Sequence, residues 1–466
     1  MPIPWSRLLS PQTAEGAEVE ITGWNALPDG SGNGRSRSLI LAATPPCCPG
    51  CPPDPACMVE VLADAPIPAS RGQLRLTGRW HPLPAGDPSG WRWQLRQAHF
   101  AGLAAAPGPW LARRALLASL PLACVAATAA CTAAPTAAAT TAPLADARPM
   151  DLHSHAGRVI LGRLRQRPPE PIAAPMRDGG MALIALAMVA DTPTTQVTPD
   201  NRIAAFRPPE PGELARHGEA AFQRLAGIAH DQDLRLVTDR TGLAAVTGGG
   251  AGPAILVAAE GADFLEGRLE ALEEAFRTHH LRHLQLVHYR VNELGDIQTE
   301  PPVHQGLTSF GAEVVRGCNR LGIVVDVAHA SFLTTRGVAE ASSRPLILSH
   351  TSIAQRPGPR SRQITADHAR LVAGTGGVIG IWPPASIFPT LRAYAEGLAR
   401  SVDVVGIDHV GIGTDMQGLL SPACFADYRQ TPALAEALLV AGFGAAEAAK
   451  VLGGNYARVL ETVLPA

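Results

Sequence analysis

The chain has 466 residues, of which 46% are apolar and 17% are charged, and its formal net charge is −2. This length is too great for one small domain, and the apolar content is sufficient for a large core. The near-neutral charge gives no electrostatic reason to expect nucleic acid or an anionic membrane surface as a partner. The eight cysteines lack the dense, regular spacing of a small secreted disulfide scaffold. We therefore expect two domains and no nucleic-acid partner.

Residues 1–105 are predicted to form a small β-rich domain. Short apolar and β-branched runs alternate there with Gly, Pro, Asp and Ser, as in small barrels and sandwiches. The predicted strands are AEVEITGWNAL, RSLILAAT, CMVEVLA, GQLRLTGRW and GWRWQLRQAHF. An OB-like barrel is one form that this pattern fits.

The β-rich region contains a cluster of cysteines, Cys47, Cys48, Cys51 and Cys57. Cys-x-x-Cys spacing allows two thiolates to face one zinc ion, so the cluster is a candidate second metal site. No second cysteine pair or histidine follows at zinc-ribbon spacing. A disulfide-bridged or reduced loop is the alternative interpretation.

Residues 106–149 are predicted to hold an export-signal-like or anchor-like segment and a linker. Leu111 to Cys131 combine the pair Arg113-Arg114, an apolar run and small residues before a cysteine, a layout typical of twin-arginine export signals. The segment follows about a hundred residues, so it is either an anchor, a junction between two joined units, or an Ala-rich linker. The run is short for a membrane span and is broken by Pro121. Residues 132–149 are rich in Ala, Thr and Pro and read as a flexible linker.

This segment also bears on localisation. If it is used, the C-terminal domain lies outside the cytoplasm, exported or associated with the membrane through residues 111–131, and we favour this arrangement over a cytoplasmic one.

Residues 150–466 are predicted to form a (β/α)8 barrel. Eight short apolar runs alternate with amphipathic helical stretches, which fits a closed parallel barrel. The predicted strands are PMDLHSH, GGMALIALAMVAD, AILVAAEGAD, LQLVHYRVN, GIVVDVAHA, PLILSHTS, GGVIGIWPP and HVGIGTD. An open doubly wound sheet is the alternative, but no Gly-rich dinucleotide-binding turn follows the first strand.

Polar residues capable of binding a metal follow these apolar runs at the strand ends. In a (β/α)8 barrel the strand ends form one rim, so residues distant in sequence converge there. Burying so many histidines and carboxylates without a common purpose is costly, and imidazole and carboxylate together suit zinc. A single histidine at a strand end is usually a structural residue, and only the set favours a metal site. The set is His153, His155, Glu260, His288, His329, His350 and Asp415.

The region from about residue 150 to the end resembles the membrane (renal-type) dipeptidase family of zinc peptidases. The stretches that carry the resemblance are VAAEGAD, LQLVHYRVNELGD, GLTSFGAEVVRGCNRLGIVVDVAHAS, PLILSHTS, RSRQITAD, HVGIGTDMQG and LGGNYARV. Their order and spacing extend over about two thirds of the chain. The resemblance implies a (β/α)8 barrel with two zinc ions that cleaves dipeptides, and we also consider a homodimer.

The resemblance implies a role for each matching residue. Glu260 matches the carboxylate that bridges two zinc ions. His329 and His350 match the ligands of one ion, and His153 matches a ligand of the other. His288 matches the histidine that contacts the substrate and steadies the tetrahedral intermediate. Arg362 matches the arginine that binds the terminal carboxylate of the substrate, and Asp415 matches the acid/base partner of the bridging hydroxide.

The sequence departs from the family in its first motif, where His153-Ser154-His155 stands in place of His-x-Asp. His155 can still bind zinc, but a neutral imidazole in place of a carboxylate raises the positive charge of the site and is expected to weaken one ion position. Asp263 and Gln417 are smaller departures that bear on substrate preference. For Arg362, a surface arginine in the loop RPGPRSR is the alternative.

Three functional hypotheses follow from these residues. The first is a zinc-dependent dipeptidase that uses a metal-bridging hydroxide. The second is a metal-dependent amidohydrolase acting on another small amide or a lactone, which the His-x-His motif favours slightly. The third is a non-catalytic, envelope-associated binding protein that keeps the barrel as a scaffold.

Overall fold

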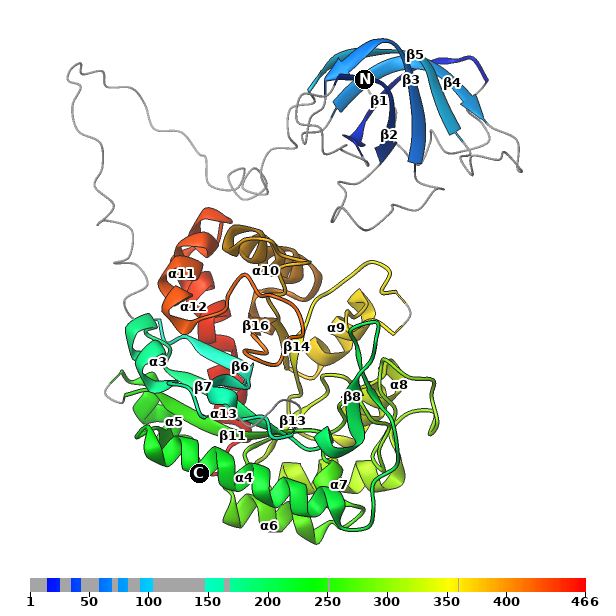
Figure 1. Ribbon diagram of the computed structural model, residues 1–466. Coiled ribbons are helices and arrows are strands. Elements are labelled where there is room, and N and C mark those ends of the chain that lie inside the picture. The colour runs from blue at the N-terminus through cyan, green and yellow to red at the C-terminus, as the bar shows by residue number, and fades with distance from the viewer. Residues whose placement is uncertain are drawn as a thin grey trace, which may run out of the picture. The chain divides into compact units, whose positions relative to one another are not determined.

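The computed structural model describes residues 15–25, 35–42, 58–68, 74–82, 93–103, 147–162, 168–249, 252–358 and 360–466. The chain divides into two compact units, Met1–Ala130 and Cys131–Ala466 (Figure 1). The cysteine cluster and the signal-like segment at residues 111–131 lie outside the described residues. Within the described ranges, no helix combines the length and hydropathy needed to cross a membrane.

The N-terminal unit contains a closed five-stranded barrel. Its strands are β1 (Glu18–Asn25), β2 (Arg35–Ala42), β3 (Met58–Pro68), β4 (Leu74–Pro82) and β5 (Trp93–Leu103). They pair in the order β1-β2-β3-β5-β4, with β4 returning to β1 and β3 parallel to β5. Burial alternates along β4, which places Leu74, Leu76 and Trp80 in the barrel core. The all-β prediction is confirmed, and five strands closed into a small barrel are the form expected of an OB-like domain.

The C-terminal unit is a closed barrel of eight parallel strands, as predicted. The strands are β6 (Met150–Ser154), β7 (Leu183–Val189), β11 (Ala254–Glu260), β12 (His283–Gln285), β13 (Val324–Asp326), β14 (Ile347–Thr351), β15 (Val378–Ile381) and β16 (Val410–Ile412). Neighbouring strands pair around the ring, and β16 closes it on β6 through Ile412 and Asp151. A two-residue strand, β10 (Arg235–Leu236), pairs with β11 from outside the ring.

Helices follow the strands and surround the barrel (Figure 1). They are α3 (Ala173–Gly179), α4 (Glu213–Asp231), α5 (Arg240–Thr247), α6 (Glu270–Thr278), α7 (Ser309–Leu321), α8 (Phe332–Ala341), α9 (Ala366–Gly374), α10 (Leu391–Val405), α11 (Thr431–Val440), α12 (Ala445–Ala449) and α13 (Asn455–Val463). Several begin at Ser, Thr or Asp side chains that accept from the first turn, as Thr308 does from the Gly311 amide. A hairpin, β8 (Thr195–Val197) with β9 (Ile203–Ala205), extends the loop after β7.

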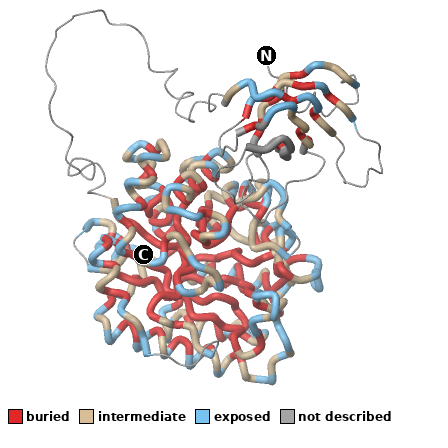
Figure 2. The backbone as a smooth tube through the Cα atoms, turned by 45° about the horizontal axis from the view of Figure 1, so that its top comes forward, coloured by how far each residue is buried: buried red, intermediate tan, exposed pale blue. Residues whose placement is uncertain are grey.

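The strands are buried on both faces, which explains their continuous apolar runs. Every residue of β7 and β11 is buried, and the two strands pair from Leu183–Ala254 to Val189–Glu260. One core cluster packs alternate strand residues against the helices, and a second joins the remaining strand residues to Tyr456 and Leu460 of α13. Figure 2 shows this buried centre and the more exposed helical periphery.

Candidate metal centre

Seven predicted metal-site residues meet at the carboxyl ends of the barrel strands. His153 and His350 lie within β6 and β14, and Glu260 is the last residue of β11. The other four follow their strands by one to three residues: His155 after β6, His288 after β12, His329 after β13 and Asp415 after β16. All seven are buried, with exposed fractions of 8% or less. The barrel thus brings together residues separated by more than 260 positions in sequence.

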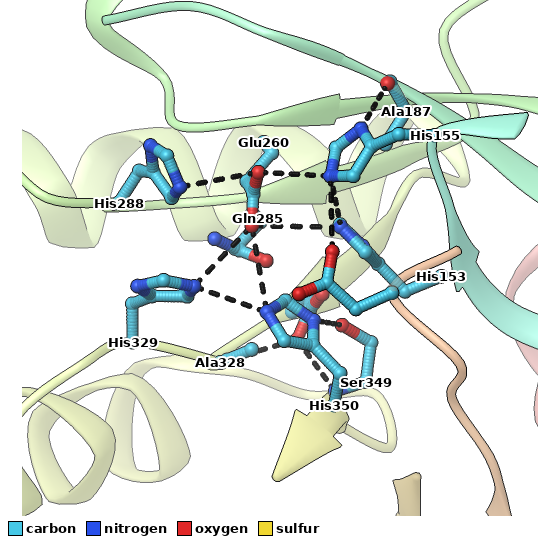
Figure 3. Close-up of polar contacts among 12 residues, drawn as sticks. His153, His155, Ala187, Glu260, Gln285, His288, Ala328, His329, Ser349 and His350 are labelled. Carbon is cyan, nitrogen blue, oxygen red and sulfur yellow. Dashed lines mark hydrogen bonds and ion pairs between the residues drawn. The ribbon is translucent and has the colours of Figure 1, made fainter. Parts of the chain in front are cut away.

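Glu260 lies at the centre of the histidines (Figure 3). Its Oε1 is 3.5, 3.3 and 3.4 Å from the Nε2 atoms of His153, His329 and His350. Its Oε2 is 3.1 and 3.2 Å from the Nε2 atoms of His155 and His288. The two oxygens of one carboxylate therefore face two different groups of imidazoles, as a carboxylate that bridges two ions must.

Hydrogen bonds at the far nitrogens orient several of these rings. His155 Nδ1 is 2.8 Å from the Ala187 carbonyl oxygen, which can only accept, so Nδ1 carries a proton and Nε2 is the nitrogen that faces the centre. Nδ1 of His350 lies 3.0 Å from the Ser349 hydroxyl, and Nδ1 of His288 lies 2.7 Å from Asp191. Such contacts are typical of histidines that bind metal through the other nitrogen.

The donor set fits divalent metal ions. The Nε2 atoms of His153 and His155 are 3.1 Å apart, and those of His329 and His350 are 3.0 Å apart. Imidazole nitrogens that converge this closely, when deprotonated, can share one ion as ligands. Among the described residues, three groups have ligand atoms within 4.8 Å of one another: His153, His155 and Asp415; His153, Glu260 and His350; Glu260, His288 and His329.

The pKa shifts of His329 and His350 agree with this interpretation, whereas burial lowers the pKa of His153 but is outweighed by the adjacent Glu260 carboxylate, which raises that pKa to about 9. Burial is the largest cause that lowers the pKa values of His329 and His350 well below the usual range, which favours neutral imidazole. Burial opposes ionisation of Glu260, but the adjacent His288, His153 and His155 hold its pKa well below the usual value. Burial raises the pKa of Asp415, opposed by His155 and supported by Glu260. Asp415 is thus a carboxyl that can both take and release a proton.

Irregular backbone geometry at several candidate ligands directs their side chains towards Glu260. Strand register shifts between Asp151 and Ser154 in β6 and between Leu348 and Thr351 in β14, around His153 and His350. His329 and Asp415 have φ angles of 67° and 50°, a left-handed conformation that costs energy for residues other than glycine. Bulges and strain of this kind concentrate where a side chain must be redirected for function.

Asp151, which was not predicted from the sequence as a site residue, supports the metal-site end of the barrel through hydrogen bonds. It is fully buried and accepts hydrogen bonds from the Thr414 amide at 2.8 Å, the Thr414 hydroxyl at 2.5 Å and the Tyr428 hydroxyl at 2.8 Å. Burial raises its pKa to about 6 against these bonds. Asp151 joins β6 to the segment that carries Asp415. Thr414 and Tyr428 lie more than 260 residues away in sequence, so no local pattern could have predicted this role.

Asp191 is a second residue that the sequence did not reveal. It directly follows β7, and its two oxygens accept from His288 Nδ1 at 2.7 Å and from the Tyr289 amide at 3.0 Å. The strand-end position that identified Glu260 is the signal that could have identified it.

Arg362 lies beside the histidine centre. Its Nη1 donates to Gln298, and its Nη2 is 3.4 Å from the His350 carbonyl oxygen. Its Nε is shielded from solvent and has no hydrogen-bond partner among the described residues. Arg362, Asp415, Tyr289 and Trp382 line one cavity of about 290 Å³, close to the lower limit for small-molecule sites. The structure thus places the predicted carboxylate-binding and acid/base residues in one cavity.

The two smaller departures from the family pattern have partners outside this cavity. Asp263 accepts from Arg290 Nε at 2.8 Å, and burial raises its pKa to about 6. Gln417 accepts from the Arg158 amide and donates to Glu170, both at 2.8 Å. Neither lines the cavity, so each acts on substrate preference at most through its neighbours.

Comparison with known proteins agrees with these observations. The model of the membrane dipeptidase family (peptidase family M19) matches residues 218–465. Dipeptidase aclJ of Aspergillus oryzae is 32% identical over 196 residues, which cover 39% of this chain and 45% of that protein. The chain spans about half the length of the curated relatives it matches.

Two solved structures share the fold. A metallopeptidase from Rhodobacter sphaeroides, liganded with a phosphinate mimic of the dipeptide L-Ala-D-Ala, is 21% identical with a TM-score of 0.57 and covers 68% of this chain and 99% of its own. An amidohydrolase from Pseudomonas aeruginosa is 22% identical with a TM-score of 0.55 and covers 69% of this chain and 98% of its own. Both are similar to the C-terminal barrel in architecture.

Proposed function

The chain belongs to the membrane dipeptidase family, and we propose that it is a metal-dependent dipeptidase that holds two zinc ions in the barrel. The observation that carries the proposal is Glu260, whose carboxylate oxygens lie 3.1 to 3.5 Å from the Nε2 atoms of five histidines. His153 and His155 would hold one ion, and His329 and His350 the other, with Glu260 shared. When bound, such ions supply Lewis acidity and a nucleophile at neutral pH.

The position of His155 supports its assignment as a ligand, although a carboxylate is usual there in the family. Its Nε2 lies 3.4 Å from Asp415 Oδ1 as well as 3.1 Å from Glu260. Asp415 therefore supplies negative charge next to the neutral imidazole. This proximity offsets part of the charge lost with the His-x-His motif.

Three side chains supply the proton transfer, the charge stabilisation and the substrate binding that the reaction also needs. Asp415, with its raised pKa, takes the proton from the attacking water and returns it to the leaving amine. His288, held by Asp191, presents Nε2 at the same centre and stabilises charge that develops on the carbonyl oxygen. Arg362 binds the free carboxylate, which limits substrates to very short peptides.

The direct test is Glu260→Gln in the full chain, supplied with zinc and assayed against a panel of dipeptides, tripeptides and lactones. Loss of a charged group at the centre costs several kcal/mol of transition-state stabilisation, so we expect dipeptide turnover to fall by about 10³-fold. Glu396→Gln, a half-exposed residue paired with Arg392 on α10, is the matched control and should keep wild-type activity.

The alternatives predict different results in this assay. Full activity of Glu260→Gln would contradict the proposed mechanism. Turnover of a lactone with no dipeptide hydrolysis would select another amidohydrolase activity. No turnover and no bound metal after purification in zinc would select the binding protein. Membrane association through residues 111–131, a homodimer and zinc at the cysteine cluster stay predictions.

A further inference from the structure

Tyr289 lies between the histidine centre and Arg362. Its ring centroid is 4.5 Å from that of His288 and 4.7 Å from that of His329, which it meets nearly edge-on at 87°. Its side chain lines the cavity that Arg362 and Asp415 also line. Its backbone amide donates to Asp191 at 3.0 Å, so the residue is held from the same side as His288. Tyr289 therefore lines the cavity and is held in place by these contacts.

The phenol of Tyr289 lies beside Arg362, because the two side chains interact and line the same cavity. A guanidinium can only donate, so the phenol oxygen accepts and its own O–H is directed to an acceptor. Arg362 lines the same cavity and supplies a second donor group beside this O–H. Two adjacent donors, one of them on a cation, match the two oxygens of a carboxylate.

We propose that Tyr289 is a substrate-binding residue whose hydroxyl donates a hydrogen bond to the carboxylate held by Arg362. Tyr289 then makes the site selective for substrates with a free carboxylate. The proposal rests on the proposed dipeptidase function, and it adds a residue to the recognition of that substrate.

The geometry favours the carboxylate over the reacting carbonyl as the partner of this hydroxyl. The ring of Tyr289 packs against the rings of His288 and His329. The oxygen is beside Arg362, whose Nη2 approaches the His350 carbonyl and whose Nη1 is held by Gln298. A hydroxyl in that position acts on binding of the substrate, and its loss should raise KM rather than lower kcat.

The test compares Tyr289→Phe with the wild-type chain on alanyl-alanine and on its C-terminal amide. Removing a hydrogen bond to a charged group should raise KM for the free acid by about tenfold to a hundredfold, with kcat changed less than about threefold. KM for the amide should not change. Tyr456→Phe is the matched control, because Tyr456 belongs to the core cluster joined to α13, its hydroxyl contacts His283, and it does not line the cavity.

A double-mutant cycle with Arg362→Gln distinguishes substrate binding by Tyr289 from a purely structural role, because only shared binding of one carboxylate couples the two effects on KM. If both residues bind one carboxylate, their effects on KM should be less than additive. Equal KM values for Tyr289→Phe and wild type would overturn the proposal, as would a loss of kcat with KM unchanged, or equal effects on acid and amide. If the wild-type chain hydrolyses no dipeptide, the proposed function itself fails, which is a distinguishable result.

Discussion

Gly418 offers a steric test of the metal centre that substitutes none of the candidate ligands. Its amide donates to the Asp415 carbonyl at 2.9 Å, and a Cβ added at this position would lie 1.9 Å from Asp415 Oδ1 and 2.5 Å from His155 Cδ2. Real Cβ contacts essentially never fall below 3.0 Å, so Gly418→Ala must displace Asp415 by about 1 Å.

A displacement of this size is large compared with the tolerance of a catalytic site. Misplacement by about 1 Å can cost about 10²-fold in rate, and we expect kcat/KM of Gly418→Ala for a dipeptide to fall by that factor. The affinity for one of the two metal ions should fall as well, because His155 is also pushed. The assay is steady-state hydrolysis together with metal content after dialysis.

Gly227→Ala is the matched control. Gly227 is exposed in α4, and a Cβ there would meet nothing within 4 Å. Alanine in a helix interior is favoured over glycine by about 0.5–1 kcal/mol, so this variant should be slightly more stable and fully active. If Gly418→Ala kept kcat/KM within about threefold of wild type, the close approach of Asp415 and His155 would not be required for activity, and their assigned roles would be wrong.

Three further predictions concern the surroundings of the centre. Asp191→Asn removes the charge that faces His288 Nδ1. In steady-state kinetics it should lower kcat by about 10²-fold or more with little change in KM. An unchanged kcat would refute the role of Asp191 in positioning His288. Burial lowers the pKa of His368 from 6.5 to about 4, so the unfolded chain binds a proton that the folded chain rejects, and stability is lost as pH falls from 6.5 towards 4. The loss reaches about 3 kcal/mol, and urea midpoints at pH 7 and pH 5 should differ less in His368→Gln than in wild type. Removing metal with a chelator should lower the melting temperature and abolish hydrolysis, and zinc should restore both. An equal melting temperature with and without metal would contradict the expectation that the bound ions stabilise the folded chain.

The barrel was predictable because its strands are buried on both faces. Leu183–Val189 and residues 254–259 are unbroken apolar runs, and eight short apolar runs that alternate with amphipathic helical stretches favour a parallel barrel over an open doubly wound sheet. The metal-site residues were found by the same pattern, since a charged or imidazole side chain directly after a buried run stands out. Glu260 is the clearest example.

The supporting contacts were not predictable, because they join segments that are distant in sequence. Asp151 is part of the first strand motif, but its partners Thr414 and Tyr428 come from the last part of the barrel sequence. Tyr289 follows His288 in a motif quoted for the resemblance, but its neighbour Arg362 lies in a loop 73 positions later. Hydrogen bonds of this kind depend on how the strands close into a ring, which no local spacing encodes.

Hydrolysis of a dipeptide as a function of zinc added to the metal-free chain tests the central claim most directly. The site built on Glu260 predicts no turnover without metal, and activity that rises until two equivalents are bound by the barrel. Full turnover in the metal-free chain, or no dipeptide hydrolysis at any zinc concentration, would contradict it.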